Sequence, residues 1–154
     1  MSHALALTLH IVAGVAGLVL GPLAIQSAVR QQHTVAAEVY HWLVAATAVT
    51  AIGLAFDDWS GLWWFVPIAL GSYAFALAAY LPATRHSPGW AGRRIRGQGG
   101  SYIALWTAVF VVSAGGIPPL WVLPTAVGAP VVEWLSHRTS QAGAVRRSAA
   151  PPGT

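Results

Sequence analysis

Apolar segments about 20 residues long divide this sequence, and the charged side chains lie almost entirely between them. A helix needs about 20 mainly apolar residues to cross the hydrocarbon core of a bilayer. The segments do not alternate between apolar and polar residues, which favours helices over the strands of a transmembrane barrel. Charged residues make up 8% of the chain, whereas about 25% is typical of a soluble domain. The sequence therefore predicts a helical membrane protein.

The hydropathy pattern divides the chain into a folded domain and a tail. We expect five transmembrane helices, at residues 4–29, 35–56, 62–83, 99–115 and 120–137. A loop rich in Arg and Gly would join the third helix to the fourth at 84–98. Pro118 and Pro119 force a break before the fifth helix, because proline cannot donate a helical hydrogen bond. The expected fold class is all-α, a polytopic bundle with a five-helix transmembrane domain at 1–138 and a disordered basic tail at 139–154.

The positions of the arginines predict the orientation in the membrane. All eight cationic residues are arginines, and they follow the first span, separate the third from the fourth, or follow the fifth: Arg30, Arg85, Arg93, Arg94, Arg96, Arg138, Arg146 and Arg147. Five spans place all of them on one side, whereas four spans would divide them. Because arginine-rich loops stay in the cytoplasm, we expect an outside N-terminus and a cytoplasmic C-terminus.

The positions of the arginines also indicate which binding partners to expect. A net charge of +4 would suggest nucleic acid in a soluble protein, but arginines beside apolar spans are better explained by membrane orientation, so we expect no nucleic-acid partner. Anionic lipid headgroups are the expected partners of the arginine loops. The chain has no cysteine, which excludes disulfides, thiol catalysis and cysteine-ligated metals.

The first span carries one histidine and three glycines on a single face. His10, Gly14, Gly17 and Gly21 recur at spacings of four, three and four residues, which places them on one side of a helix. Small residues at this spacing let another helix approach closely, and a flat cofactor could use the same groove. We favour helix packing, with His10 hydrogen-bonded to a neighbouring helix. The alternative is a ligand or proton-transfer role for His10, with Gly14 and Gly17 lining a cofactor site.

The start of the second span carries an acid and an imidazole. Glu38 and His41 are three residues apart, so they share a helix face and could pair. Such a pair can fix the tautomer of the imidazole and hold a proton near neutral pH. Alternatively, Glu38 stabilises the first turn through the helix dipole. Together with His10, Gly14 and Gly17, these two residues are the expected cofactor-binding set, and we expect no metal site.

Three segments carry a family resemblance. They are 9–14 with its continuation at 20–22, His33 with Val39-Tyr40, and 99–104 with Thr107-Ala108 and Val111-Val112 behind it. Together they resemble a bacterial family of membrane proteins catalogued as domain of unknown function 2306. Thr34 and Ala37 stand where that family has arginine and glycine, and Arg94 stands where it usually has histidine. The resemblance implies a compact helical, multi-pass protein of the bacterial plasma membrane with histidines near helix ends, and it supplies no known reaction.

These observations leave several functions open. The first is a redox or cofactor-binding membrane protein with haem or quinone as the ligand, because histidines lie within spans beside a glycine groove. The expected orientation opposes a bis-histidine haem held by His10 and His41, since His10 would lie near the outer face and His41 near the inner one. It leaves open a single inner site that uses His41 with His86 or His137. The second is a non-enzymatic accessory or small-molecule-binding component, alone, as a homo-oligomer or with a membrane partner. A membrane enzyme acting on an isoprenoid or lipid is a third, less favoured interpretation.

Overall fold

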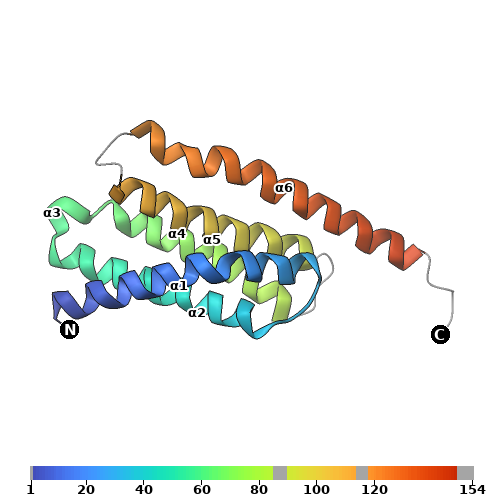
Figure 1. The fold of residues 1–154 in the computed structure, drawn as a ribbon, viewed down its shortest axis with the longest axis horizontal. Coiled ribbons are helices and arrows are strands. Elements are labelled where there is room, and N and C mark those ends of the chain that lie inside the picture. The colour runs from blue at the N-terminus through green and yellow to red at the C-terminus, as the bar shows by residue number, and fades with distance from the viewer. Residues whose placement is uncertain (1, 85–89, 114–117, 149–154) are drawn as a thin grey trace.

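The protein is described by a computed structural model at residues 2–84, 90–113 and 118–148, and within those ranges the only regular element is the helix (Figure 1). The order is α1 (His3–Val29), α2 (Val35–Asp57), α3 (Trp59–Leu62), α4 (Phe65–Thr84), α5 (Trp90–Ser113) and α6 (Pro118–Ser148). The predicted all-α class is confirmed. The four-residue α3 connects α2 to α4, and the other five helices correspond in order to the five apolar segments.

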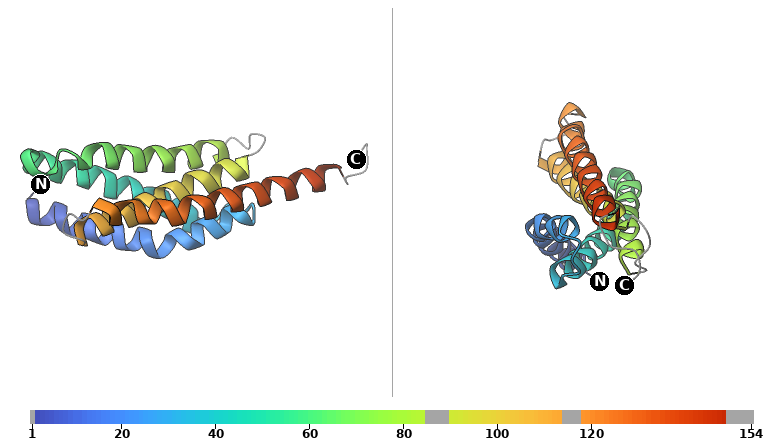
Figure 2. Two further views of the ribbon diagram at one scale, coloured as in Figure 1. Left: turned by 90° about the horizontal axis from the view of Figure 1, so that it is seen from above. Right: turned by 90° about the vertical axis from the view of Figure 1, so that its right-hand side faces the viewer.

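The five long helices run side by side along one axis, and consecutive helices point in opposite directions (Figures 1 and 2). Helix α5 is central, because α1, α4 and α6 all pack against it, while α2 packs between α1 and α4. Helix α6 packs almost entirely on α5, and its last turns project beyond the bundle (Figure 2). Below, the end that contains α3 is called the α3 end, and the end where α1 turns into α2 is called the Arg94 end.

A left-handed residue ends α1 and begins the turn to α2. Gln31 has a φ of 56°, and the N–H of Gln32 donates to the carbonyl of Ser27 at 2.9 Å, which is the usual way of satisfying the last carbonyls of a helix. Thr34 then caps α2 by accepting from the N–H of Ala37. The turn is therefore specified locally, and it leaves the carbonyl of Gln32 free to bind another helix.

Glycines set the close approach of α5 to its neighbours. A Cβ atom at Gly97 would collide with the backbone of α4 at Phe75 and Ala79, and a Cβ atom at Gly99 would collide with Val132 of α6. The absence of a side chain lets the backbone of α5 meet the backbone of α4 at Gly97 and the side chain of Val132 at Gly99, as small residues let helices approach closely. Gly97 and Gly99 thus lie on two contact faces of α5, one against α4 and the other against α6.

An ion pair also joins α5 to α6 at the Arg94 end. The guanidinium of Arg96 donates to both carboxylate oxygens of Glu133, with Nε–Oε2 at 2.9 Å and Nη2–Oε1 at 2.6 Å. His137 lies 2.8 Å from the same carboxylate, one turn further along α6. This two-point geometry specifies the register of α6 on α5.

Helix α5 begins earlier than predicted. It starts at Trp90, nine residues before the expected start at residue 99, so the predicted loop is wrong over 90–98, and 85–89 lie outside the described residues. The stretch has two glycines and three arginines and therefore reads as a loop. Arginine is a good helix former, however, and Gly92 and Gly97 lie where α6 and α4 leave no room for a side chain.

Helix α6 ends later than predicted. It continues to Ser148, eleven residues past the expected end at 137, so residues 139–148 of the expected disordered tail are helical, while 149–154 lie outside the described residues. The tail was predicted to be disordered because it is poor in apolar residues. Its proline residues, however, come only at 151 and 152, and alanine, glutamine and arginine before them favour a helix.

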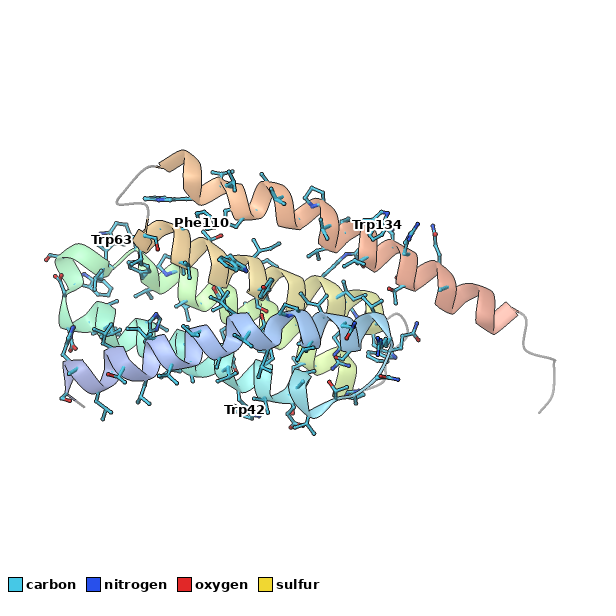
Figure 3. The ribbon with its side chains drawn as sticks, in the orientation of Figure 1. Trp42, Trp63, Phe110 and Trp134 are labelled. Carbon is cyan, nitrogen blue, oxygen red and sulfur yellow. The ribbon has the colours of Figure 1, made fainter. Side chains whose placement is uncertain are left out.

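Among the described residues, two helices, α1 and α2, are long and apolar enough to cross a membrane, and α4 contains a shorter apolar stretch at Phe65–Leu81. Many large apolar side chains of the bundle point outward. Figure 3 shows Trp42 of α2 at one edge, pointing away from the other helices, and Trp134 of α6 at the opposite edge. These two indoles are 60% and 53% exposed. Large apolar side chains are therefore found on the outside of the bundle as well as in its core.

Candidate functional site

A polar pocket lies between α2, α4 and α5 at the Arg94 end. Its volume is about 380 Å³, which falls within the range of about 300–1,000 Å³ typical of small-molecule sites. Three helices and the turn before α2 contribute its polar lining among the described residues, which consists of His33, Thr34, Glu38, Tyr40, His41, Tyr80, Arg94 and Gln98. Two residues of the expected site, Glu38 and His41, therefore do belong to one pocket.

Arg94 is a buried cation with neutral partners. The residue is 4% exposed, and its Nη1 donates to the carbonyl of Gln32 at 2.9 Å while Nη2 lies 3.5 Å from the hydroxyl of Ser27. The guanidinium also lies 5.7 Å from the centre of the Trp90 ring. A guanidinium has five N–H groups, so three of them have no oxygen partner among the described residues. The pocket thus contains a positive charge whose hydrogen-bonding capacity is only partly used.

His41 lies in the same pocket and is 6% exposed. Its ring stacks on Tyr80, with centroids 4.4 Å apart and planes 15° apart, and the backbone of Ala76 is within hydrogen-bonding reach of the imidazole. The Nδ1 atom is buried and has no hydrogen-bond partner in the part of the chain that the structure describes. An unsatisfied buried polar atom costs about 1–3 kcal/mol, so this nitrogen favours any ligand that supplies a polar atom to it.

Glu38 lies one turn before His41, at the exposed mouth of the pocket. The sequence predicted that the two side chains could pair. Within the part of the chain that the structure describes, no hydrogen bond or ion pair joins them, and Nδ1 of His41 has no partner there. Their shared helix face places both in one pocket without bringing them into direct contact.

Tyr40 and Ser101 close the pocket towards the interior of the bundle. Both are fully buried, the Tyr40 hydroxyl donates to Ser101 Oγ at 2.9 Å, and Ser101 Oγ donates to the Gln98 carbonyl at 3.0 Å. The side-chain oxygen of Gln98 is a second buried polar atom that has no partner at 2–84, 90–113 or 118–148. Sequence reasoning did not find Gln98, Ser101 or Tyr80 as site residues, because they lie on α4 and α5 and no spacing along the chain relates them to His41.

His10 belongs to the other half of the bundle. Its Nδ1 lies 3.1 Å from the Thr47 carbonyl and 3.2 Å from the Thr50 hydroxyl of α2, which agrees with the packing interpretation. Those partners follow His41 by six and nine residues, or about 9–14 Å at 1.5 Å per residue. His10 and His41 line different cavities, so they do not face each other across one ligand. Among the described residues, no group of three or more His, Asp or Glu could hold a metal ion.

Gly14 and Gly17 lie on the expected face of α1. A Cβ atom at Gly17 would lie 3.3 Å from Leu105 Cδ1 of α5, and one at Gly14 would lie 3.9 Å from Thr47 Cγ2 of α2. The groove at Gly17 is thus filled by a side chain of α5, which leaves no room for a flat cofactor there. Gly14 lines a second, apolar cavity together with His10.

The three segments that carry the family resemblance meet in the structure. Tyr40 of the second segment bonds to Ser101 of the third, and the ring of Tyr102 packs directly on Gly21 of the first. Arg94 lies in the pocket beside this meeting point. Comparisons of the chain with protein-family models, with curated proteins and with solved structures found no match. Function is therefore argued from the site.

Proposed function

We propose that this chain is a multi-pass membrane protein with five transmembrane helices, an outside N-terminus and a cytoplasmic C-terminus. The outward faces of the helices support this. Eight large apolar residues of α1 are exposed: Leu5, Leu7, Leu9, Ile11, Val12, Val15, Val19 and Leu23. Helix α6 exposes Val122, Leu123, Val127 and Val131. Soluble monomers rarely expose apolar surface of this extent, whereas lipid tails would cover it in a bilayer.

Helix lengths and charges support the same topology. Helices α4, α5 and α6 contain 20, 24 and 31 residues, and about 20 suffice to cross the bilayer core. The ends of the helices at the Arg94 end carry Arg30, Arg93, Arg94, Arg96 and Arg138, while Asp57 and Asp58 lie at the α3 end. Arginines mark the cytoplasmic side, so the Arg94 end faces the cytoplasm.

The polar pocket then faces the cytoplasmic side, and its role in this proposal is to bind a small molecule that carries a carboxylate or a phosphate. The observation that carries this is Arg94, a buried cation with neutral partners and unused N–H groups. A guanidinium binds both kinds of anion through two parallel hydrogen bonds. The unpartnered atoms of His41 and Gln98 would bind further polar groups of the same ligand.

Of the functions that the sequence left open, the proposed function corresponds to the small-molecule-binding membrane component. A haem between His10 and His41 receives less support, because the two imidazoles line different cavities. The proposal also includes three further points. They are membership of the family catalogued as domain of unknown function 2306, binding of anionic lipid headgroups at the arginine loops, and a homo-oligomer or membrane partner. The meeting of the three resembling segments around Tyr40 and Gly21 supports the first of these.

Binding to the full chain in lipid nanodiscs tests this function. The probes are benzoate, phenyl phosphate and the neutral benzamide, and calorimetry measures their affinities. We expect one or both anions to bind at least tenfold more tightly than benzamide, because a hydrogen bond to a charged group contributes about 1.5–3 kcal/mol. Arg94→Gln should remove the preference for an anion.

Two further variants and a control separate binding from folding. Arg94→Lys keeps the charge and loses the two-point geometry, so it should retain part of the preference. His41→Phe keeps the stacking on Tyr80 and removes the unpartnered nitrogen, so it should weaken binding. It also removes the contact of the imidazole with the backbone of Ala76, so its stability is measured beside its affinity. Arg30→Gln, which removes an exposed arginine, should bind like the wild type. Equal binding of benzoate, phenyl phosphate and benzamide to the wild type would refute the proposal.

A further inference from the structure

A second cavity lies in the α3 half of the bundle, between α1, α2, α4 and α5. Its volume is about 460 Å³, and its lining is apolar except for His10, Thr47, Ser72 and Ser113. A buried cluster that includes Tyr40, Val44 and Leu105 lies between this cavity and the polar pocket. Anything bound here is therefore independent of the ligand proposed for the polar pocket.

The hydrogen bonds of His10 determine which of its nitrogens carries a proton. The Thr47 carbonyl can only accept, so Nδ1, 3.1 Å away, must donate to it. The Thr50 hydroxyl already donates to the Ala46 carbonyl at 2.7 Å, so it too accepts from Nδ1. In the neutral imidazole the other nitrogen, Nε2, then has a lone pair. Within the described part of the chain Nε2 has no hydrogen-bond partner, although His10 lines the cavity.

The hydroxyl groups within the cavity also present acceptors. Thr47 donates its proton to the Leu43 carbonyl at 2.8 Å, and Ser72 donates to the Ile68 carbonyl at 2.7 Å. Both protons are used within their own helices, which leaves only oxygen lone pairs towards the cavity. The fourth polar residue, Ser113, is exposed and is the last residue of α5. Among the described residues, the interior of the cavity therefore offers three side-chain acceptors and no side-chain donor.

We propose that this cavity binds an apolar molecule that carries a hydroxyl group, and that the hydroxyl donates to Nε2 of His10. The apolar walls take a hydrocarbon ring or chain, and the acceptors select a molecule that can donate a hydrogen bond. A ring with two hydroxyls, such as a quinol, and an isoprenoid alcohol share this chemistry. Their carbonyl or ether counterparts, which only accept, would leave the lone pair of His10 facing another lone pair and are discriminated against.

Matched probes in nanodiscs containing the full chain test the proposal. Under anaerobic conditions, tetramethylhydroquinone is compared with tetramethylbenzoquinone, and farnesol is compared with farnesyl methyl ether. We expect the hydroxyl-bearing member of at least one pair to bind about threefold to tenfold more tightly, the effect of one neutral hydrogen bond. The pair that shows the difference identifies whether the natural ligand class is the quinol or the alcohol.

A spectroscopic signal and two variants make the test specific to His10. In protein labelled with ¹⁵N-histidine, the Nε2 resonance of His10 should shift with the hydroxyl-bearing probe and stay unchanged with its counterpart. His10→Phe should abolish the preference within the pair, and Ala108→Phe, which fills the cavity, should abolish binding of both members. Val12→Ala, an exposed position on α1, is the control. Equal affinities within both pairs, no shift at Nε2, or no binding of any probe would overturn the proposal.

Discussion

Tyr40 on α2 and Ser101 on α5 share a hydrogen bond of 2.9 Å in the centre of the bundle, and both residues are fully buried. Ser101 in turn donates to the carbonyl of Gln98. The pair therefore forms a polar connection between α2 and α5 through two residues that are sixty-one positions apart in the chain, at the boundary between the two cavities.

The two hydroxyls should be energetically coupled. Tyr40→Phe should destabilise the protein by about 0.5–1.5 kcal/mol, since Ser101 keeps its bond to Gln98. Ser101→Ala should cost more, about 1–3 kcal/mol, because it leaves the buried Tyr40 hydroxyl poorly satisfied. The double variant should cost less than the sum. Unfolding by SDS in mild detergent measures all three, and strictly additive effects would show that the bond contributes nothing.

Backbone contact at Gly97 should make this position intolerant of any side chain. Gly97→Ala should destabilise by about 1–3 kcal/mol, because the added Cβ would meet the backbone of α4 at Phe75 and cannot displace it. Gly71→Ala on α4 is the matched control, since nothing lies within 4 Å of its added Cβ. That control should be neutral or stabilise by up to about 1 kcal/mol. Equal effects at the two positions in SDS unfolding would contradict the close contact of α4 with α5.

The left-handed residue at the end of α1 should be improved by glycine. Gln31 has a positive φ, which costs a residue with a side chain about 1–2 kcal/mol and costs glycine little. Gln31→Gly should therefore raise the midpoint of thermal unfolding, while Gln31→Val should lower it. Gln32→Gly, one residue further on, lacks this rationale and should not stabilise. A stabilisation at both positions would point to an effect on the unfolded chain alone.

The proposed topology can be tested with single cysteines, because the natural sequence has none. A membrane-impermeant maleimide applied to intact cells should label Ser60→Cys, which lies in the short α3. It should label Gln141→Cys, an exposed residue of α6, only after the cells are permeabilised. Labelling of Gln141→Cys in intact cells would mean that α6 does not cross the membrane. Equal labelling of both before permeabilisation would exclude the five-span topology.

The sequence predicted the helices well where hydropathy alone defines them. Helices α1 and α2 begin and end within one residue of the expected bounds, and α4 begins three residues later than expected. The ends that were missed are the start of α5 and the end of α6. Both are polar helical extensions, so hydropathy does not register them. The glycines that suggested a loop at 90–98 are instead required by the contacts of α5 with its neighbours.

The candidate site was found only in part. Glu38 and His41 were identified because their spacing places them on one helix face, and both line the polar pocket. His10 was identified too, but its position in a separate cavity depends on how α1 lies against α2. Arg94 was noted as one of the arginines that predict the orientation and for its place in a family resemblance, and its burial was not foreseen. Its burial beside Gln32 and Ser27 requires the α1–α2 turn to lie under α5.

By itself, the sequence determined the number and order of the long helices and the approximate ends of α1, α2 and α4, because apolar length and the absence of charge are local properties that any window of residues shows. The tertiary structure alone decided which polar groups are buried without partners. One pocket contains His41, Gln98 and Arg94, and another contains His10. This arrangement depends on how α1, α2 and α5 pack, through contacts between residues far apart in the chain. Those contacts depend on side-chain packing, which no periodicity along the sequence encodes.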